Sequence, residues 1–349
     1  MKSIVIVSLH FSPGFIGHMQ AWYKMCQQCD LTPFLYIDSQ YTKYFENSKY
    51  KYVTNINGVI ERKPEYAVVQ NTGIENIPFF RWCSKNKCKI FYILHEPYMG
   101  LSELLKDGTY CVKQAIACIL NVWLCYKAQK VIICSDYAEK NCRKYMKNVS
   151  RKMVRFPLIF SDEFNDIEIV ERKYFSLIGT YAVSKGSDLF LKFVKESVKR
   201  GYHINFMIAT RSDLEEQLKD ATLKRLVKEG RLVVKHGRNM TTKEINFAYK
   251  QSICCWNGYR RSTQSGVLPN AFMMGTPVLA TRLGSFEEFV IPGATGEFID
   301  NEDSDSIYNA YLKVKRNEKH MSETCRKYFV QRFYYKNQKE MFEEILAKE

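Results

Sequence analysis

The segment 258–290 holds the residues whose types and spacing best fit the binding of phosphate. Four residues that suit the start of a helix lie together there: Thr263, Gln264, Ser265 and Gly266. Pro269 fits the first turn of such a helix, where its missing N–H costs nothing. Unpaired N–H groups at a helix start attract phosphate, and Arg260 and Arg261 just upstream add fixed positive charge. We therefore predict a diphosphate site, the alternative being an ordinary capped helix beside two solvated arginines.

Two further candidates lie where predicted strands end in the first half of the chain. The apolar run 2–9 predicts a buried parallel strand, and the loop after it contains Gly14 and Gly17. These glycines could let the backbone approach a ligand, although a plain strand-to-helix turn explains them equally well. His95 ends another strand, 89–94, at the sheet edge where α/β proteins bind ligands. A lone histidine at such a place is either structural or part of a site.

Strand-like and helical segments alternate along the chain. In the first half, further strands are expected at 31–37, 66–70 and 130–134, and the clearest helices at 74–85 and 111–129. In the second half, strands are expected at 174–178, 203–208, 231–236, 253–257 and 278–281. The alternation favours an α/β fold with two successive Rossmann-like, doubly wound sheets. The polar stretch 157–172 has no periodicity and is the expected hinge, whereas 39–65 suggests an extended loop or hairpin.

Two runs in the second half resemble the donor-binding segment of retaining GT-B glycosyltransferases of the glycosyltransferase family 4 type. They are 259–269 (Tyr-Arg-Arg-Ser-Thr-Gln-Ser-Gly-Val-Leu-Pro) and 275–281 (Gly-Thr-Pro-Val-Leu-Ala-Thr), with Gly284 after them. The branch of the family with Thr-Gln-Ser-Gly at this point is the most similar. The resemblance implies two Rossmann-like domains facing across a cleft. It places an acceptor domain at 1–160, a nucleotide-sugar domain at 161–325 and a C-terminal helix at 326–349 that packs back on the first domain.

The resemblance also extends to the loop 179–188. In the family, this loop places an arginine and a lysine on the diphosphate of the donor. Lys185 matches the lysine, and Thr180 stands at the position of the arginine. We expect Arg260 or Arg261 to replace the missing charge.

Three more positions bear on the sugar. Ser262 and Asn270 stand where the family has two glutamates that hold the donor sugar and the ribose, so any contact there is neutral and weaker. His95 matches a histidine that lies beside the transferred sugar. The resemblance thus implies that His95 orients the sugar.

The implied activity is transfer of a sugar, with retention, from a nucleotide-diphospho-sugar to a glycan acceptor. The acceptor would be carried on a lipid such as a polyprenyl diphosphate, in the synthesis of a surface polysaccharide. The donor is a substrate, and no separate cofactor is expected. The sequence has no Asp-x-Asp motif, and Lys185 and Arg260 could neutralise the leaving diphosphate, so we expect a metal-independent reaction. The leaving phosphate could take the proton of the acceptor, which removes the need for a side-chain base.

Positive charge is concentrated in the first part of the chain. Residues 1–160 contain 22 Lys and Arg against 11 Asp and Glu, a net +11, while the remainder has 30 against 26, a net +4. Two basic clusters stand out: Lys85, Lys87 and Lys89, and Arg143, Lys144, Lys147, Arg151, Lys152 and Arg155. We expect an anionic membrane surface as the partner, and the alternative is a solvated surface that aids solubility.

Two other functions are alternatives to this hypothesis. A nucleic-acid-binding protein would explain the charge, but the lysines are not interleaved with aromatic residues in a known module, so we expect no nucleic acid. A GT-B sugar-nucleotide epimerase would need acidic groups in its site, and Ser262 and Asn270 offer none.

The cysteines and apolar runs bear on the location of the protein. Most of the 12 cysteines lie in apolar patterns and are expected to be reduced core residues, and Cys26 and Cys29 lack a second pair that would complete a metal site. No apolar run reaches the roughly 18–20 residues of a membrane-spanning helix, and the N-terminus does not resemble a signal peptide. We expect a cytoplasmic protein, peripheral at the inner face of the membrane. The helix 111–129 is then either a core helix or a half-exposed helix that docks on anionic lipid.

Overall fold

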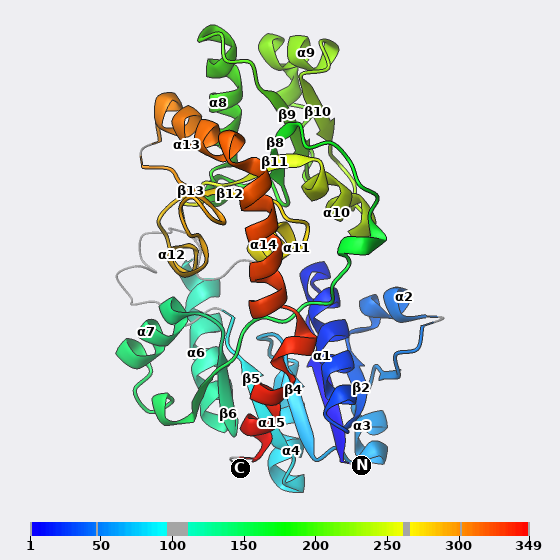
Figure 1. Cartoon of the computed structure of the whole chain (residues 1–349). Coiled ribbons are helices and arrows are strands. Elements are labelled where there is room, and N and C mark those ends of the chain that lie inside the picture. Colours follow the sequence, from blue (N-terminus) through cyan, green and yellow to red (C-terminus); the bar gives the residue numbers. More distant parts are fainter. Residues whose placement is uncertain (1, 47, 96–110, 261–265, 301, 348–349) are drawn as a thin grey trace. The chain divides into compact units, whose positions relative to one another are not determined.

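The computed structural model describes residues 2–46, 48–95, 111–260, 266–300 and 302–347, and Figure 1 shows the whole chain. The chain divides into two compact units, residues 1–161 with 332–349, and residues 162–331. Each unit contains one parallel sheet with helices between its strands. The predicted α/β class with two Rossmann-like sheets is confirmed.

The first unit contains a seven-stranded parallel sheet in the order β3-β2-β1-β4-β5-β6-β7. Its strands are β1 (Ser3–Ser8), β2 (Thr32–Ile37), β3 (Tyr52–Val53), β4 (Tyr66–Val69), β5 (Lys89–Ile93), β6 (Lys130–Ile133) and β7 (Met153–Arg155). Strand β1 is the third strand in this order, and its Ile4 is paired with Pro33 of β2 on one side and Tyr66 of β4 on the other. The strand order therefore reverses between β1 and β4, and the carboxyl ends of these strands form the edge where such sheets bind ligands.

Helices cover both faces of this sheet. They are α1 (Ile16–Gln28), α2 (Thr42–Phe45), α3 (Ile56–Arg62), α4 (Asn76–Asn86), α6 (Cys111–Lys127), α7 (Asp136–Tyr145) and α15 (Lys339–Ala347). Successive strand residues point to opposite faces, so Tyr92 packs with α4 and α6 while Phe91 contacts Phe342 of α15, with ring centroids 6.1 Å apart. The ring centroid of Trp22 in α1 lies 5.2 Å from that of the same Phe342. Figure 1 shows α1 and α15 on one side of the sheet.

The region 39–65 is not the extended loop or hairpin that its composition suggests. It contains α2, the edge strand β3 and α3, and β3 is paired with β2 in parallel, Leu35 opposite Tyr52. A hairpin would have placed the strands antiparallel. Asn55 caps α3 by accepting a hydrogen bond from the N–H of Gly58, a local signal for a helix in a stretch without hydrophobic periodicity.

The second unit contains a six-stranded parallel sheet in the order β10-β9-β8-β11-β12-β13. Its strands are β8 (Tyr174–Ile178), β9 (Asn205–Ala209), β10 (Leu232–Lys235), β11 (Ser252–Asn257), β12 (Val278–Ala280) and β13 (Gly296–Phe298). Its helices are α8 (Ser187–Lys199), α9 (Ala221–Lys228), α10 (Thr242–Lys250), α11 (Val267–Met273), α12 (Phe286–Phe289), α13 (Ser304–Arg316) and α14 (Glu318–Arg332). Phe175 of β8 packs against Phe190 and Phe193 of α8 and Tyr311 of α13, which form one side of the core.

The Gly-Thr-Pro turn before β12 is held by Arg172, which is largely buried. The guanidinium of Arg172 donates to the carbonyls of Ser252 (2.8 Å) and Met274 (2.6 Å) and pairs with Glu318 (3.1 Å). Gly275 has a φ of +64°, and a Cβ there would lie 2.8 Å from Oγ of Ser322. This part of the segment 258–290 therefore has a structural role, because it fixes the start of β12.

The C-terminal segment is helical but is not one continuous helix. Helix α14 ends at Arg332, a 3₁₀ turn covers Tyr335–Gln338, and α15 follows. Between the helices the chain bonds to Phe160, whose N–H donates to the carbonyl of Phe333 (2.8 Å) and whose carbonyl accepts from the N–H of Tyr335 (3.1 Å). These backbone bonds cannot form within a helix, so the helix is interrupted where the chain joins the first unit.

Candidate functional site

The loop after β8 is built by backbone bonds to the neighbouring strand. The N–H of Gly179, a residue with a φ of +118°, donates to the carbonyl of Ala209 at the end of β9 (2.9 Å). The N–H of Tyr181 then lies 3.2 Å from the hydroxyl oxygens of both Thr210 and Ser212. Thr180 is therefore held between two anchored residues at the carboxyl edge of the sheet.

The loops after β8 and β11 approach each other closely at two glycines. A Cβ on Gly186, which has a φ of +62°, would lie 1.9 Å from the carbonyl oxygen of Gly258, so only glycine fits. The indole N–H of Trp256 donates to the carbonyl of Gly186 (3.1 Å), and the N–H of Arg260 donates to the carbonyl of Ser184 (2.9 Å). The structure thus brings the predicted Lys185 loop and the start of the segment 258–290 together.

Lys185 lies in this junction and is half-buried. Its Nζ is 5.5 Å from the centre of the Tyr259 ring, and no carboxylate among the described residues forms an ion pair with it. Burial, and then the nearby positive charge of Arg211, lower the pKa of the Lys185 ammonium. A cation in such a place is stabilised when an anion binds beside it.

Arg260 is differently placed. Its guanidinium pairs with Asp188 (2.7 Å) and Glu302 (3.4 Å) and also donates to the carbonyl of Val183 (3.1 Å). Its charge is already matched by two carboxylates, so the expectation that it replaces the charge missing at Thr180 is not supported. Arg260 instead ties the loop after β11 to the start of α8.

The helix start predicted around 263–266 is described only in part. Thr263, Gln264 and Ser265 lie outside the described residues, as do Arg261 and Ser262. Helix α11 begins at Val267, and its N-cap position is Gly266, which makes no side-chain cap. The side-chain cap expected from Thr263, Gln264 or Ser265 therefore stays a prediction. Pro269 lies in the first turn, as its chemistry predicts.

In the first unit, His95 lies two residues after the end of β5, beside α1. Its ring centre is 5.0 Å from that of Phe15 and 6.1 Å from that of His18. One ring nitrogen bonds to the backbone of Gln70, while Nε2 is buried and has no hydrogen-bond partner among the described residues. Burial, and then His18, lower the pKa of His95 to about 3, so the ring is neutral at neutral pH. A neutral imidazole whose other nitrogen is a donor presents Nε2 as an acceptor.

Gly17 is in the first turn of α1 rather than in the loop before it. A Cβ on Gly17 would meet no atom within 4 Å, so the packing around it does not require a glycine. The open space beside it leaves room for a ligand at the same edge as His95.

The structure adds polar residues that were not predicted from the sequence. The Nδ1–H of buried His18 donates to the carbonyl of Ile159 (3.1 Å), and burial lowers the pKa of His18 to about 4. Gln70 follows β4 and is 0% exposed, yet both atoms of its amide lack partners among the described residues. Asn71 donates to Ser8 and to the carbonyl of His10. A run Gln-Asn-Thr at the end of a buried strand was the available signal.

Residues 172–317 match the family model described as "Glycosyl transferases group 1".

The solved structures that resemble the chain share its fold. HepE from Anabaena, in complex with UDP, has 13% identity and a TM-score of 0.73, with 100% of both chains covered. The sucrose-phosphate synthase from Thermosynechococcus elongatus also has 13% identity and a TM-score of 0.73, covering 100% of this chain and 99% of its own. A glycosyltransferase from Rickettsia africae has 10% identity and a TM-score of 0.72, over 99% and 98%. Comparison with curated proteins gives no match. The fold expected from the resemblance, two α/β domains of the GT-B type, is confirmed.

The sequence predicts neither a metal site nor a membrane-spanning helix. Within the described ranges, no group of three or more His, Cys, Asp or Glu side chains is arranged to hold a metal ion. The cysteines described are all free thiols; Cys26 is buried, and burial raises the pKa of Cys29 to about 11. In the same part of the chain, no helix has the length and apolar character that crossing a membrane requires.

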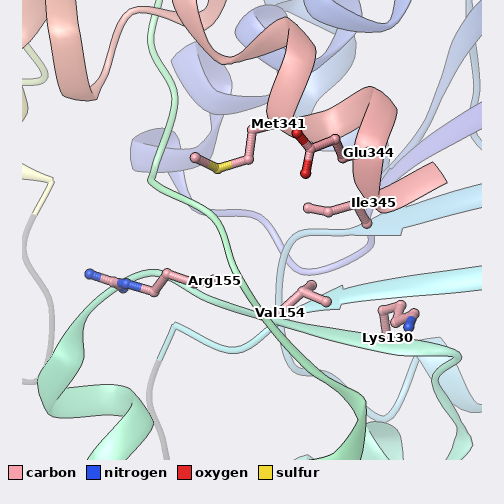
Figure 2. Close-up of a pocket in the computed structure, with 6 residues that line it drawn as sticks. All are labelled: Lys130, Val154, Arg155, Met341, Glu344 and Ile345. Carbon is pink, nitrogen blue, oxygen red and sulfur yellow. The ribbon is translucent and has the colours of Figure 1, made fainter. Parts of the chain in front are cut away.

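A small groove of the first unit lies away from the candidate site. Figure 2 shows it between β6, β7 and α15, lined by Lys130, Val154, Arg155, Met341, Glu344 and Ile345. Its volume is about 220 Å³, whereas ligand pockets usually measure about 300–1,000 Å³. The groove is therefore a packing gap beneath α15 rather than a substrate site.

Proposed function

We propose that the chain is a glycosyltransferase that takes a sugar from a nucleotide-diphospho-sugar, which binds to the second unit. The observation that carries this proposal is that the match to glycosyl transferases group 1 spans the loop with Lys185, a half-buried cation without a carboxylate partner among the described residues. A diphosphate beside Lys185 would form charge-assisted hydrogen bonds with its ammonium group. These bonds would offset the free-energy cost of burying the charge.

UDP is the first nucleotide to test as the carrier of the donor sugar. HepE was crystallised with UDP, with UDP and glucose, and with UDP-glucose. Those complexes show only what HepE binds, and they suggest UDP-linked sugars as the first donors to test with this chain. Ser262 and Asn270 stand where the resembling family has glutamates, so the sugar that this chain accepts need not be glucose.

In this proposal, His95 orients the transferred sugar. Its Nε2 would accept a hydrogen bond from a sugar hydroxyl, because the ring is neutral and that nitrogen has no other partner among the described residues. Configuration would be retained, and the leaving phosphate oxygen would take the proton of the acceptor hydroxyl as the new glycosidic bond forms. Lys185 would stabilise the charge that develops on the leaving diphosphate, without a metal ion.

For the acceptor, we propose a glycan on a lipid carrier at an anionic membrane surface. Helix α6 has a buried side, with Leu124 and Cys125, and an exposed apolar stripe of Ile116 (56%), Ile119 (70%), Val122 (39%) and Tyr126 (61%). Lys152 lies at the end of this stripe, donating to the carbonyl of Tyr126 (2.7 Å) with its Nζ 5.4 Å from the ring centre. Apolar side chains flanked by lysines fit the boundary between lipid headgroups and acyl chains.

A basic hollow in the same unit supports the proposed binding to an anionic membrane surface. It has a volume of about 570 Å³ and is lined by Arg143, Lys147, Asn148, Ser150 and Arg151. Arg143 pairs with Glu139 at 2.7 Å, but Lys147 and Arg151 have no carboxylate partner within the described part of the chain. Each well-placed basic residue contributes about 1 kcal/mol to binding an anionic leaflet. The hollow and the stripe on α6 would thus bind the same surface.

The experiment that tests the proposed activity is a thermal-shift panel with the UDP-, GDP-, dTDP- and CDP-linked sugars. A ligand that binds only the folded state stabilises it, by about 2.7 kcal/mol at a hundredfold excess over its Kd. We expect one nucleotide series to raise the midpoint of unfolding, and its diphosphate to act more strongly than its nucleoside. If no member of the panel raised the midpoint, the proposed donor class would be wrong.

A further inference from the structure

Arg211 lies beside the Lys185 loop and is fixed there by its two neighbours in the chain. The hydroxyl oxygens of Thr210 and Ser212, on either side of it, both lie 3.2 Å from the N–H of Tyr181. The hydroxyl of Thr210 also accepts from the N–H of Ser212 (3.1 Å), which closes a tight turn at Arg211. Arg211 therefore lies in a tight turn whose two flanking hydroxyl groups accept from the N–H of Tyr181, the residue after Thr180.

Arg211 differs from most arginines of the second unit in its charge environment. The guanidinium groups of Arg172, Arg200, Arg225, Arg238, Arg260 and Arg326 each pair with a carboxylate. Arg211 is exposed and pairs with none among the described residues. The nearest carboxylate along the chain, Asp213, is engaged elsewhere, with Oδ1 3.3 Å from Nδ1 of His236 and 3.0 Å from the N–H of Glu215.

The positive charges of Arg211 and Lys185 act on each other. The charge of Arg211 is close enough to contribute to the lowered pKa of Lys185. Two cations that repel each other and pair with no carboxylate among the described residues are unfavourable in the free protein, and an anion bound near both reduces the repulsion. A diphosphate carries enough charge for both, and the planar guanidinium can contact two of its oxygens at once.

We propose that Arg211 is a diphosphate-binding residue that, together with Lys185, holds the leaving group of the donor and supplies the charge that Thr180 lacks. The inference rests on the proposed function, because it assigns one more contact to the same donor. It replaces the earlier expectation for Arg260, whose guanidinium already pairs with Asp188 and Glu302.

Calorimetric titration of the full chain tests this assignment. The probe is whichever of UDP, GDP, dTDP and CDP raises the unfolding midpoint most, and its nucleoside is titrated in parallel. Arg211→Ala should weaken binding of the diphosphate by about 10- to 100-fold, the range for a charge-assisted hydrogen bond, and leave binding of the nucleoside unchanged. Arg211→Lys should recover part of the loss. The control is Arg225→Ala, an exposed arginine on α9 that pairs with Glu229, which should bind both probes as the wild type does.

Each other outcome overturns the inference in a distinguishable way. If Lys185→Ala binds the diphosphate more weakly than the wild type but Arg211→Ala binds it normally, the assignment of Arg211 is wrong and the proposed function stands. An equal loss of diphosphate and nucleoside affinity in Arg211→Ala would show a structural effect, and the unfolding midpoint of Arg211→Gln would check it. If the wild type binds none of the four diphosphates, both proposals fail.

Discussion

His95 has a chemically specific feature, a buried ring nitrogen without a partner in the described part of the chain. Burial, and then the nearby His18, lower the pKa of His95 to about 3, so the ring is neutral, and it packs against Phe15 with ring centroids 5.0 Å apart. A structural histidine would be expected to satisfy both nitrogens, because a buried polar atom left unpaired costs roughly 1–3 kcal/mol. The unpaired Nε2 therefore favours a role in binding a ligand.

His95→Ala should reduce turnover far more than nucleotide affinity. The contact proposed is with the sugar and strengthens as the glycosidic bond breaks, so its loss is felt in kcat. Steady-state kinetics and calorimetric titration of the nucleoside diphosphate would measure the two effects. His320→Ala, an exposed histidine on α14, serves as the control. An equal loss of turnover and affinity in His95→Ala would contradict the proposed contact.

His18 and His95 should also make the fold sensitive to acid. Their pKa values are lowered by burial to about 4 and about 3, whereas an unfolded imidazole titrates near 6.5. As the pH falls from 6.5 towards 4, the unfolded chain takes up protons that the folded chain does not, so stability is lost at up to about 1.4 kcal/mol per pH unit for each group.

The measurement is the unfolding midpoint at pH 7 and pH 5. His18→Gln should show a smaller drop than the wild type, because it removes one of the two titrating groups. His203→Gln changes an exposed histidine of the second unit. Its unfolding midpoint should drop by as much as that of the wild type. An unaltered drop in His18→Gln would mean that His18 does not titrate as its burial predicts.

At the scale of elements, the junction of the loops after β8 and β11 positions Lys185. Gly186→Ala should displace this junction, because the added Cβ would overlap the carbonyl of Gly258, a backbone atom that cannot rotate away. We expect at least a tenfold weaker binding of the nucleoside diphosphate and a lower unfolding midpoint.

Gly201→Ala is the matched control for this prediction. Gly201 also has a left-handed backbone, with a φ of +69°, but a Cβ there meets nothing within 4 Å. That variant should lose only about 1–2 kcal/mol of stability and keep its nucleotide affinity. Equal nucleotide affinity in the two variants would show that the junction does not position the site.

Helix α6 gives a second prediction at this scale. The protein should sediment with vesicles that contain anionic lipid, and binding should fade as salt is raised, because the attraction is screened. Ile119→Glu places a charge in the exposed stripe and should reduce sedimentation, whereas Val227→Glu on α9 changes an exposed apolar residue of the other unit and should not. A protein that ignored anionic vesicles at low salt would favour an acceptor in solution.

Sequence patterns predicted the elements better than the contacts between them. The strand expected at 174–178 is β8 with the same bounds, because a buried strand has a continuous apolar signal. The two-residue strand β3 and the three-residue β13 are too short for such a signal. The pairing of Arg260 with Asp188 and Glu302 joins residues 72 and 42 positions apart, which no local pattern shows. Gln70 and Arg211 likewise became candidates only when the strand ends were placed.

At the scale of the whole molecule, the two units differ in the chemistry they offer. The first contains neutral polar groups at its sheet edge, with an apolar stripe and unpaired basic residues elsewhere on its surface. In the second, six arginines pair with carboxylates, whereas Lys185 and Arg211 at the candidate site pair with none among the described residues. This division fits a first unit that binds a neutral sugar and a lipid surface, and a second unit that binds a diphosphate.

The most direct test of the account is a calorimetric titration of the full chain, in buffer with EDTA, with the nucleoside diphosphate that stabilises it most. We expect saturable binding without a divalent metal. Lys185→Ala should weaken it about 10- to 100-fold, because a charge-assisted contact worth roughly 1.5–3 kcal/mol is lost. Lys192→Ala, an exposed lysine on α8, should bind as the wild type does. The absence of binding by the wild type, or an unchanged Kd in Lys185→Ala, would contradict the central claim that Lys185 holds the diphosphate of a sugar donor.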